Sequence, residues 1–326
     1  MIFLVWGCSK SGTPAATTKT TDTAFAGGAD VSWVTQMESQ QILFYNTQGT
    51  QQDLFQILKG LGMNAIRLRV WVNPSDGWCG TADVLAKAKR ATSAGMKLLI
   101  DFHYSDTWAD PGHQAKPAAW ANLSTADLID TLGSYTQHVL DTLKAAGVTP
   151  TWVQVGNEVS NGMLWPDGEA SLNMNNFAAM VSAGYNAVKA VFPSCKVVVH
   201  LANGYDNTTF RWLFDGIKAG GATWDVIGMS LYPTTGNYPA LDTQCVANMR
   251  DMASRYGKEI MVCEVGMEED APGSTESFLK DIIAKTQSVN GLGVFYWEPE
   301  SYNNWQSYGL GAFGSNGEPT AALNAF

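Results

Sequence analysis

Trp152-Val-Gln-Val-Gly-Asn-Glu158 is an apolar run that ends on a carboxylate, and Ile260-Met-Val-Cys-Glu264 has the same pattern further along the chain. Such runs, apolar at nearly every position, are typical of parallel strands that are covered on both faces. From Phe25 onward the chain repeats a short strand followed by a helix. Eight strands are predicted in this way: Ala26–Val34, Asn64–Val72, Lys97–Tyr104, Trp152–Val159, Lys196–Asn203, Val226–Pro233, Glu259–Gly266 and Gly291–Pro299.

Segments with helical periodicity separate these strands. Thr125–Gly147 carries an apolar stripe and follows Ser124, a predicted N-cap. Strand starts lie roughly 30 to 55 residues apart, one βα unit each. The alternative, a doubly wound open sheet, would carry a glycine-rich phosphate loop after its first strand, and the sequence has none there. The predicted fold class is therefore α/β, a single (β/α)8 TIM barrel. The other predicted helices are Asp53–Gly62, Asn176–Phe192, Phe210–Ala219, Thr243–Tyr256 and Thr275–Gln287.

Composition limits the function classes. With 326 residues, 45% hydrophobic and 15% charged, the chain can bury one large core without disulfides or metals. The net charge of -10 disfavours nucleic acid as a partner, because like charges repel. The 12 tryptophans exceed what packing alone explains, and some of them could stack on sugar rings. The charge therefore fits a neutral or cationic substrate, or none.

The amino-terminal stretch differs from the rest of the chain. Ile2–Trp6 is apolar and runs into Gly7-Cys8-Ser9, which resembles the end of a bacterial lipoprotein signal with Cys8 as the lipid-modified residue. A Thr/Ala/Ser-rich tether follows. We therefore divide the chain into residues 1–24, a signal remnant and tether, and 25–326, the catalytic barrel. We expect an exported protein, anchored by lipid to the outer membrane or cell surface of a Gram-negative bacterium. A cytosolic chain with an accidental Cys8 is the alternative.

Membrane contact is expected only through this anchor, because no segment approaches the ~20 apolar residues that a membrane helix needs. Four other cysteines could form disulfides after export, and the three possible pairings stay open. Their spacing does not fit a zinc site of the CxxC kind, so a structural role is predicted. They are Cys79, Cys195, Cys245 and Cys263.

Active sites of such barrels lie at the carboxyl ends of the strands. Glu158 and Glu264 each end an apolar strand, where a charge is costly unless it has partners. Period-2 alternation predicts that Glu158 shares a face with Gln154, that Glu264 shares a face with Val262, and that Cys263 points away towards the helices. Two carboxylates about 5 to 5.5 Å apart serve a double-displacement glycosidase, one as nucleophile and one as proton donor.

Candidate partners of this pair occupy neighbouring strand ends. Arg67 or Arg69 could keep the nucleophile ionised, and a purely structural ion pair is the alternative. Side chains predicted to contact the substrate are Arg67, Trp71, His103, Trp108, Asn157, Tyr232, Trp297 and Trp305.

Five blocks carry a family resemblance: Gly28-Ala-Asp-Val-Ser-Trp33, Arg67-Leu-Arg-Val-Trp71, Asp101-Phe-His-Tyr-Ser-Asp-Thr-Trp-Ala-Asp-Pro-Gly112, Gln154-Val-Gly-Asn-Glu158 and Val294-Phe-Tyr-Trp-Glu-Pro299. In this order they resemble the family 53 endo-β-1,4-galactanases, in the clan of retaining (β/α)8 glycosidases. The match extends from Gly27 to Phe326.

The resemblance implies roles for several residues. Glu158 would be the acid/base and Glu264 the nucleophile, acting on β-1,4-galactan of pectin. Asn157 would bind the 2-hydroxyl next to the scissile bond, Tyr232 would contact the nucleophile, and Trp297 would form the floor for the sugar. The residues alone do not separate galactan from mannan or cellulose, and a non-catalytic glycan-binding barrel is a further alternative.

No cofactor is required by this chemistry. Some bacterial relatives carry a calcium ion in the loop after the eighth strand. Here Glu300–Tyr308 is short and offers Glu300, Asn303 and Asn304 without a carboxylate cluster, so the sequence does not support that calcium. Glu268-Glu269-Asp270 is read as a solvated acidic loop. No metal site is predicted.

Overall fold

The computed structural model describes residues 1–2 and 25–326. The predicted lipid site at Cys8 and the tether that follows it lie outside these residues. Within the part of the chain that is described, no helix is long and apolar enough to cross a membrane.

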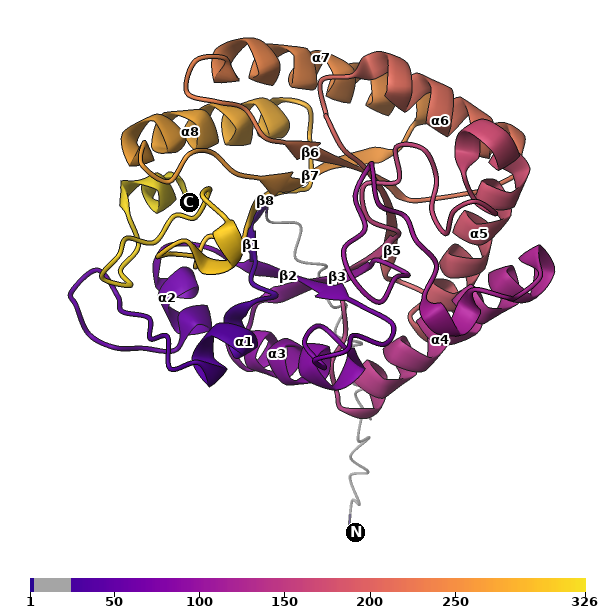
Figure 1. The fold of residues 1–326 in the computed structure, drawn as a ribbon. Helices are drawn as coiled ribbons and strands as arrows, with labels where there is room; N and C mark the ends of the chain where they lie inside the picture. The colour runs from indigo at the N-terminus through magenta and orange to yellow at the C-terminus, as the bar shows by residue number, and fades with distance from the viewer. Residues whose placement is uncertain (3–24) are drawn as a thin grey trace.

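Eight parallel strands close into one barrel in sequence order, with β1 paired to both β2 and β8. Figure 1 shows the helices as an outer ring around these strands. The prediction of a (β/α)8 barrel is confirmed. The strands are β1 (Ala26–Asp30), β2 (Ala65–Val70), β3 (Lys97–Phe102), β4 (Trp152–Val155), β5 (Lys196–Leu201), β6 (Val226–Leu231), β7 (Glu259–Val265) and β8 (Gly293–Trp297).

The helices connect successive strands. Ser124 caps α4 by accepting from the Asp127 amide, as predicted, and Asp53 caps α2 in the same way. Helix α3 was not predicted, because its buried face consists of small residues and Lys87, which give a weak apolar stripe. The helices are α1 (Val34–Ser39), α2 (Leu54–Gly60), α3 (Thr81–Ser93), α4 (Thr125–Ala145), α5 (Ala170–Val191), α6 (Asn207–Ala219), α7 (Tyr238–Tyr256) and α8 (Pro272–Ser288).

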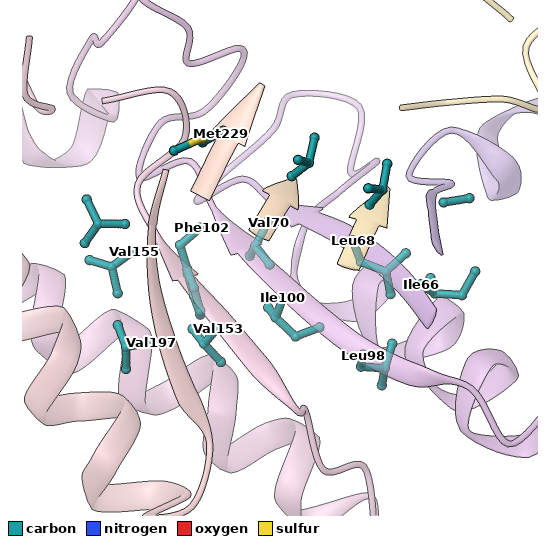
Figure 2. Packing of buried hydrophobic residues seen from close by; sticks show 14 of the residues in the cluster. Ile66, Leu68, Val70, Leu98, Ile100, Phe102, Val153, Val155, Val197 and Met229 are labelled. Atoms are coloured by element: carbon teal, nitrogen blue, oxygen red, sulfur yellow. The ribbon is translucent and has the colours of Figure 1, made fainter. Parts of the chain in front are cut away.

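Side chains of each strand alternate between two cores. The larger core lies between the barrel and the helices, and Figure 2 shows Ile66, Leu68 and Val70 of β2 packed there beside residues of β3 and β4. The smaller core consists of strand residues alone and fills the barrel interior, with Trp152 and Phe295 as its largest members. Above that layer the interior is polar, and this polar layer carries the site.

Strand β7 departs from the predicted alternation. Its pairing with β6 shifts between Met229 and Ser230, so that Cys263 is an extra residue, a β-bulge. Cys263 packs inside the barrel with Met261, while Val262 faces the helix layer. The predictions that Cys263 faces the helices and that Glu264 shares a face with Val262 were therefore wrong. The bulge is what turns Glu264 inward.

The four cysteines named above are all buried and free. None of the three pairings left open by the sequence is present. Cys79 follows β2, Cys195 precedes β5, Cys245 lies on α7 and Cys263 on β7.

Candidate active site

A cleft with a cavity volume of about 380 Å³ opens at the carboxyl ends of the strands. Seven of the residues predicted from sequence line it: His103, Trp108, Asn157, Glu158, Tyr232, Glu264 and Trp297. Three others do not. Arg67 is completely buried beneath the cleft, Trp71 lines an adjoining cavity, and Trp305 packs against the core while its neighbours 306–308 line the cleft.

Glu264 is held by two partners at the bottom of the cleft. The Nη2 atom of Arg67 lies 2.7 Å from one carboxylate oxygen, and the Tyr232 hydroxyl donates to the other at 2.8 Å. Burial raises the pKa of Glu264, while Arg67 and the Tyr232 hydrogen bond oppose that rise. When two buried carboxyls lie close together, the one with a direct cation partner loses its proton at the lower pH, and here that one is Glu264.

Arg67 organises more than this one carboxylate. It ion-pairs with Asp30 at 2.7 Å and with Asp101 at 2.8 Å, and it donates to the Asn157 Oδ1 atom at 2.8 Å. Its guanidinium is completely buried, so these bonds must satisfy it. Arg67 is therefore a positioning residue for Glu264 and Asn157 and does not reach the cleft surface.

Glu158 has the opposite environment. Burial and the charge of Glu264 raise the pKa of Glu158 to about 8, although Ser230 and Arg67 act against the rise. Strand β4 ends at Val155, and both Gly156 and Glu158 have positive φ angles, 82° and 46°. This left-handed backbone, and not continued strand alternation, turns Glu158 into the cleft. At neutral pH the side chain keeps its proton and can act as an acid.

A buried polar network underlies Glu158, and sequence reasoning missed it. Burial, Arg67 and His103 lower the pKa of His200 well below its usual range, so its ring is neutral. Two donors approach His200 Nδ1, Gln154 Nε2 at 2.9 Å and the Glu158 amide at 3.4 Å. The Asn157 Oδ1 atom also lies 3.1 Å from Nδ1, but it already accepts from Arg67 and Gln154. Nδ1 is therefore the acceptor of the ring, and the ring proton lies on Nε2, 2.7 Å from the Ser230 hydroxyl. Ser230 is then free to donate to Glu158.

Asn157 is fixed from both ends of its amide. Its Nδ2 atom donates to the Ala109 carbonyl at 2.7 Å, and its Oδ1 atom accepts from Gln154 at 3.0 Å as well as from Arg67. His103 is similarly fixed, since its Nδ1 atom accepts from the Trp71 indole at 3.1 Å and its Nε2 atom lies 3.1 Å from Asp101. Both residues line the cleft in a single defined orientation.

Four tryptophans surround the guanidinium of Arg69. Its carbon Cζ lies 5.3 Å from the ring centroid of Trp33, 5.4 Å from Trp71, 4.5 Å from Trp108 and 6.0 Å from Trp297. Cation–π attraction of this kind, in a desolvated setting, is worth about 0.5–2 kcal/mol per contact. Tyr308 adds an edge contact to Trp297 at 4.8 Å. The aromatic wall of the cleft is therefore built around one buried cation.

A carboxyl pair holds that cation. Glu298 ion-pairs with Arg69 and accepts from the Trp33 amide at 3.1 Å. Burial and Glu298 raise the pKa of Glu300 well above its usual range, which makes Glu300 the protonated partner that donates to Glu298. Glu300, considered above as a calcium ligand, is completely buried in this pair. Among residues 25–326 no group of three or more His, Cys, Asp or Glu side chains is arranged to hold a metal ion.

A barrel that places two buried carboxyls in a tryptophan-lined cleft, Glu158 just after the fourth strand and Glu264 on the seventh beside a cation, has the groups that a glycosidase of the double-displacement type uses. Comparison with known proteins narrows this class. Residues 26–326 match the family model described as glycosyl hydrolase family 53, and the chain belongs to that family.

The relatives agree with this assignment over nearly the whole chain. An arabinogalactan endo-β-1,4-galactanase of Thermothelomyces thermophilus is 34% identical and covers 92% of this chain and 98% of its own. A structure from a study of two fungal β-1,4-galactanases matches with a TM-score of 0.85 at 33% identity, over 91% of this chain and 97% of the other. The family 53 catalytic domain of Ignisphaera aggregans matches at 0.84 and 31%, over 94% and 96%.

Proposed function

We propose that the protein is an endo-β-1,4-galactanase that cleaves the galactan chain of type I arabinogalactan by double displacement. The observation that carries this proposal is the unlike surroundings of the two carboxyls in the cleft: Arg67 and the Tyr232 hydroxyl contact Glu264 directly, whereas burial and the charge of Glu264 raise the pKa of Glu158 to about 8. The relatives described above supply the substrate class.

In the first step Glu264 attacks the anomeric carbon of the galactosyl residue. The bond from that carbon to the leaving oxygen breaks, and the Glu158 proton moves to this oxygen. When Glu264 forms the ester it loses its negative charge and no longer forms an ion pair with Arg67. The ion pairs with Asp30 and Asp101 still balance the positive charge of that guanidinium.

In the second step Glu158, now ionised, takes a proton from water while the water oxygen attacks the same carbon. The ester bond to Glu264 breaks and its charge returns beside Arg67. Ser230 stabilises the transient Glu158 carboxylate, since its hydroxyl is oriented by neutral His200. Two inversions give a product with the β configuration of the substrate, and no cofactor takes part.

Two other functions compete with this one. A mannanase or cellulase would use the same carboxyls, and a glycan-binding barrel would use only the aromatic wall. The fixed protonation of Glu158 by burial favours catalysis, because a binding protein gains nothing from a buried acid beside a buried base. Reducing-sugar release from galactan, with mannan and cellulose in parallel, tests the proposal; equal or greater release from either of these would contradict it.

We also propose that the protein is exported and held at the cell envelope by lipid on Cys8. The support is the Gly7-Cys8 junction after an apolar stretch. A surface location suits an enzyme whose polymeric substrate cannot enter the cell.

A further inference from the structure

The charge of the barrel is distributed unevenly between its two ends. We define the basic end as the last turns of α2 to α8, the connections that follow them and the first residues of β2 to β8. Each of these seven helices carries a basic residue in its last turn. Three further lysines begin or directly precede strands, Lys97, Lys196 and Lys258. Within the described residues, the acidic side chains of this end are Asp225 and Glu259 alone.

The opposite end, where the cleft opens, is acidic. Among the residues described in the strand-to-helix connections from β2 to α8, Lys116 is the only lysine or arginine. All but one of these connections carry acidic residues, and one contains the run Glu268-Glu269-Asp270. A six-residue strand such as β2 rises about 20 Å between the two ends. Because the Debye length is about 8 Å at physiological salt, the acidic end does not cancel the field of the basic end.

Helix dipoles explain part of this arrangement. The carbonyl groups at the end of a helix stabilise a cation in its last turn, and their field falls off within that turn. Lysines that begin strands lie outside the helices, so the dipoles do not explain them. Both acidic residues are paired locally, Asp225 with Lys189 at 2.7 Å and Glu259 with Lys196 at 2.6 Å. An excess of positive charge remains after these pairs.

Two lysines of the basic end have main-chain carbonyls as partners. The Nζ atom of Lys59 donates to the Ala94 carbonyl at 2.7 Å, and that of Lys144 donates to the Val191 carbonyl at 3.0 Å. Neither lysine forms an ion pair within the described part of the chain. A carbonyl orients an ammonium group but leaves its positive charge uncancelled.

Two other lysines form one patch on the rings that connect α6, α7 and the strands between them. Lys218 Nζ lies 5.8 Å from the ring centroid of Tyr256, and Lys258 Nζ lies 5.6 Å from that of Trp224. The two rings contact each other with centroids 5.8 Å apart. The described residues give neither lysine a carboxylate ion pair. This patch therefore presents two uncompensated charges side by side.

The described chain enters the barrel at the basic end. Ala26 begins β1, the strand that precedes all the others, and its amide donates to the Leu292 carbonyl at 2.9 Å. The Asn64 side chain donates to the Phe25 carbonyl, also at 2.9 Å. These bonds fix the entry point beside the connections that lead into β2 and β8. The segment that links the barrel to the proposed lipid site thus starts at the basic end.

We propose that the basic end docks on a bilayer that contains anionic phospholipid, so that the cleft opens away from the membrane; the proposal rests on the lipid anchor proposed at Cys8. Residues 9–24 separate Cys8 from the barrel and span at most about 60 Å, which keeps the bilayer within reach. Each lysine beside an anionic bilayer raises the partition constant roughly fivefold. The lipid retains the protein on the membrane, and the lysines select the end of the barrel that faces it.

Vesicle binding tests the docking without the lipid. The Cys8→Ser chain is titrated at physiological salt with vesicles of phosphatidylcholine, or of phosphatidylcholine and phosphatidylglycerol in equal parts, and the bound fraction is measured by sedimentation. Binding is expected with phosphatidylglycerol alone and should weaken as salt is raised. In the same chain, Lys218→Glu with Lys258→Glu should lower the partition constant by about tenfold or more.

Arg250→Glu with Lys280→Glu is the matched control. Both residues are exposed, lie on α7 and α8 before their last turns, and give the same change in net charge. This pair should bind vesicles like the Cys8→Ser chain. If melting shows that Lys218→Glu with Lys258→Glu does not fold, Lys218→Gln with Lys258→Gln replaces it, with a loss of several-fold expected.

Activity on the vesicles gives the orientation. Lipid-bearing wild-type protein on phosphatidylglycerol vesicles should cleave galactohexaose as fast as the Cys8→Ser chain does in solution, because the cleft faces away from the bilayer. Slower cleavage on the vesicles, absence of binding to anionic vesicles, or equal binding by the two pairs of variants would overturn the docking.

An acidic polysaccharide is the competing occupant of the basic end. Binding to polygalacturonate in place of vesicles, lost in Lys218→Glu with Lys258→Glu, would assign the basic end to such a polymer and overturn membrane docking. Failure of the proposed function is distinguishable, because a Cys8→Ser chain that binds anionic vesicles but releases no sugar from galactan in solution contradicts the galactanase activity alone.

Discussion

Tyr232→Phe isolates one interaction of the nucleophile. The substitution removes a hydroxyl that donates to Glu264 at 2.8 Å and leaves the ring in place. Arg67 keeps its own contact with the other carboxylate oxygen. The change therefore weakens the stabilisation of ionised Glu264 without removing it.

The magnitude follows from the bond that is lost. A hydrogen bond to a charged group contributes about 1.5–3 kcal/mol, and about 1.4 kcal/mol corresponds to one pKa unit. Because the Tyr232 hydroxyl favours the ionised form, its removal raises the pKa of Glu264. The acidic limb of kcat/KM, which reports the nucleophile of the free enzyme, should move upward by roughly one to two pH units.

The alkaline limb provides an internal reference. It reports loss of the Glu158 proton, with a pKa raised to about 8, and Tyr232 does not contact that carboxyl directly. The bell-shaped profile should therefore narrow from its acidic side only. Tyr302→Phe is the matched control, since that hydroxyl donates to the Leu43 carbonyl outside the cleft. An acidic limb that stays in place in Tyr232→Phe would refute the assignment of Glu264 as the ionised member of the pair.

Three further predictions use other parts of the site. Trp297→Ala should lower kcat at least tenfold in folded protein, by loss of the sugar floor; a much lower melting temperature with kcat retained would make Trp297 a packing residue instead. Glu300→Gln should keep activity. Because the pKa of Glu300 is raised in the folded protein, the free energy of unfolding of the wild type falls as pH rises, so the variant should match the wild type at pH 4 and be more stable than it at pH 8. Equal melting curves of the two proteins at pH 8 would contradict this. Cys8→Ser should move the precursor from membranes to the soluble fraction of a Gram-negative host, whereas equal partitioning would exclude the anchor.

The sequence predicted the barrel and the two glutamates because both depend on local signals. Apolar strands and the charged residues that follow them, such as Glu158, can be predicted from the local sequence alone. The directions of the side chains could not be predicted as well. A β-bulge at Cys263 reverses the alternation of β7, and a left-handed backbone at Glu158 ends that of β4, and neither feature leaves a mark in apolar periodicity.

The supporting residues were missed for a different reason. His200 lies within an apolar strand, where a lone histidine is most simply interpreted as a packed side chain. A polar residue in that strand was nevertheless the one sequence signal that could have indicated the network. The pairing of Glu298 with Glu300, and their hold on Arg69, arises from burial at the end of β8. Roles of this kind depend on which neighbours a carboxyl meets in space, and spacing along the chain does not specify them.

Azide rescue tests the central claim, that Glu264 is the nucleophile and Glu158 the acid/base, most directly. In Glu264→Ala the small anion can fill the space left by the carboxylate and attack the anomeric carbon once, so nitrophenyl β-galactobioside should give the α-glycosyl azide. In Glu158→Ala the ester with Glu264 still forms, and azide should yield the β-glycosyl azide. NMR of the two products distinguishes them. An α-azide from Glu158→Ala, with no rescue of Glu264→Ala, would show that the two roles are reversed.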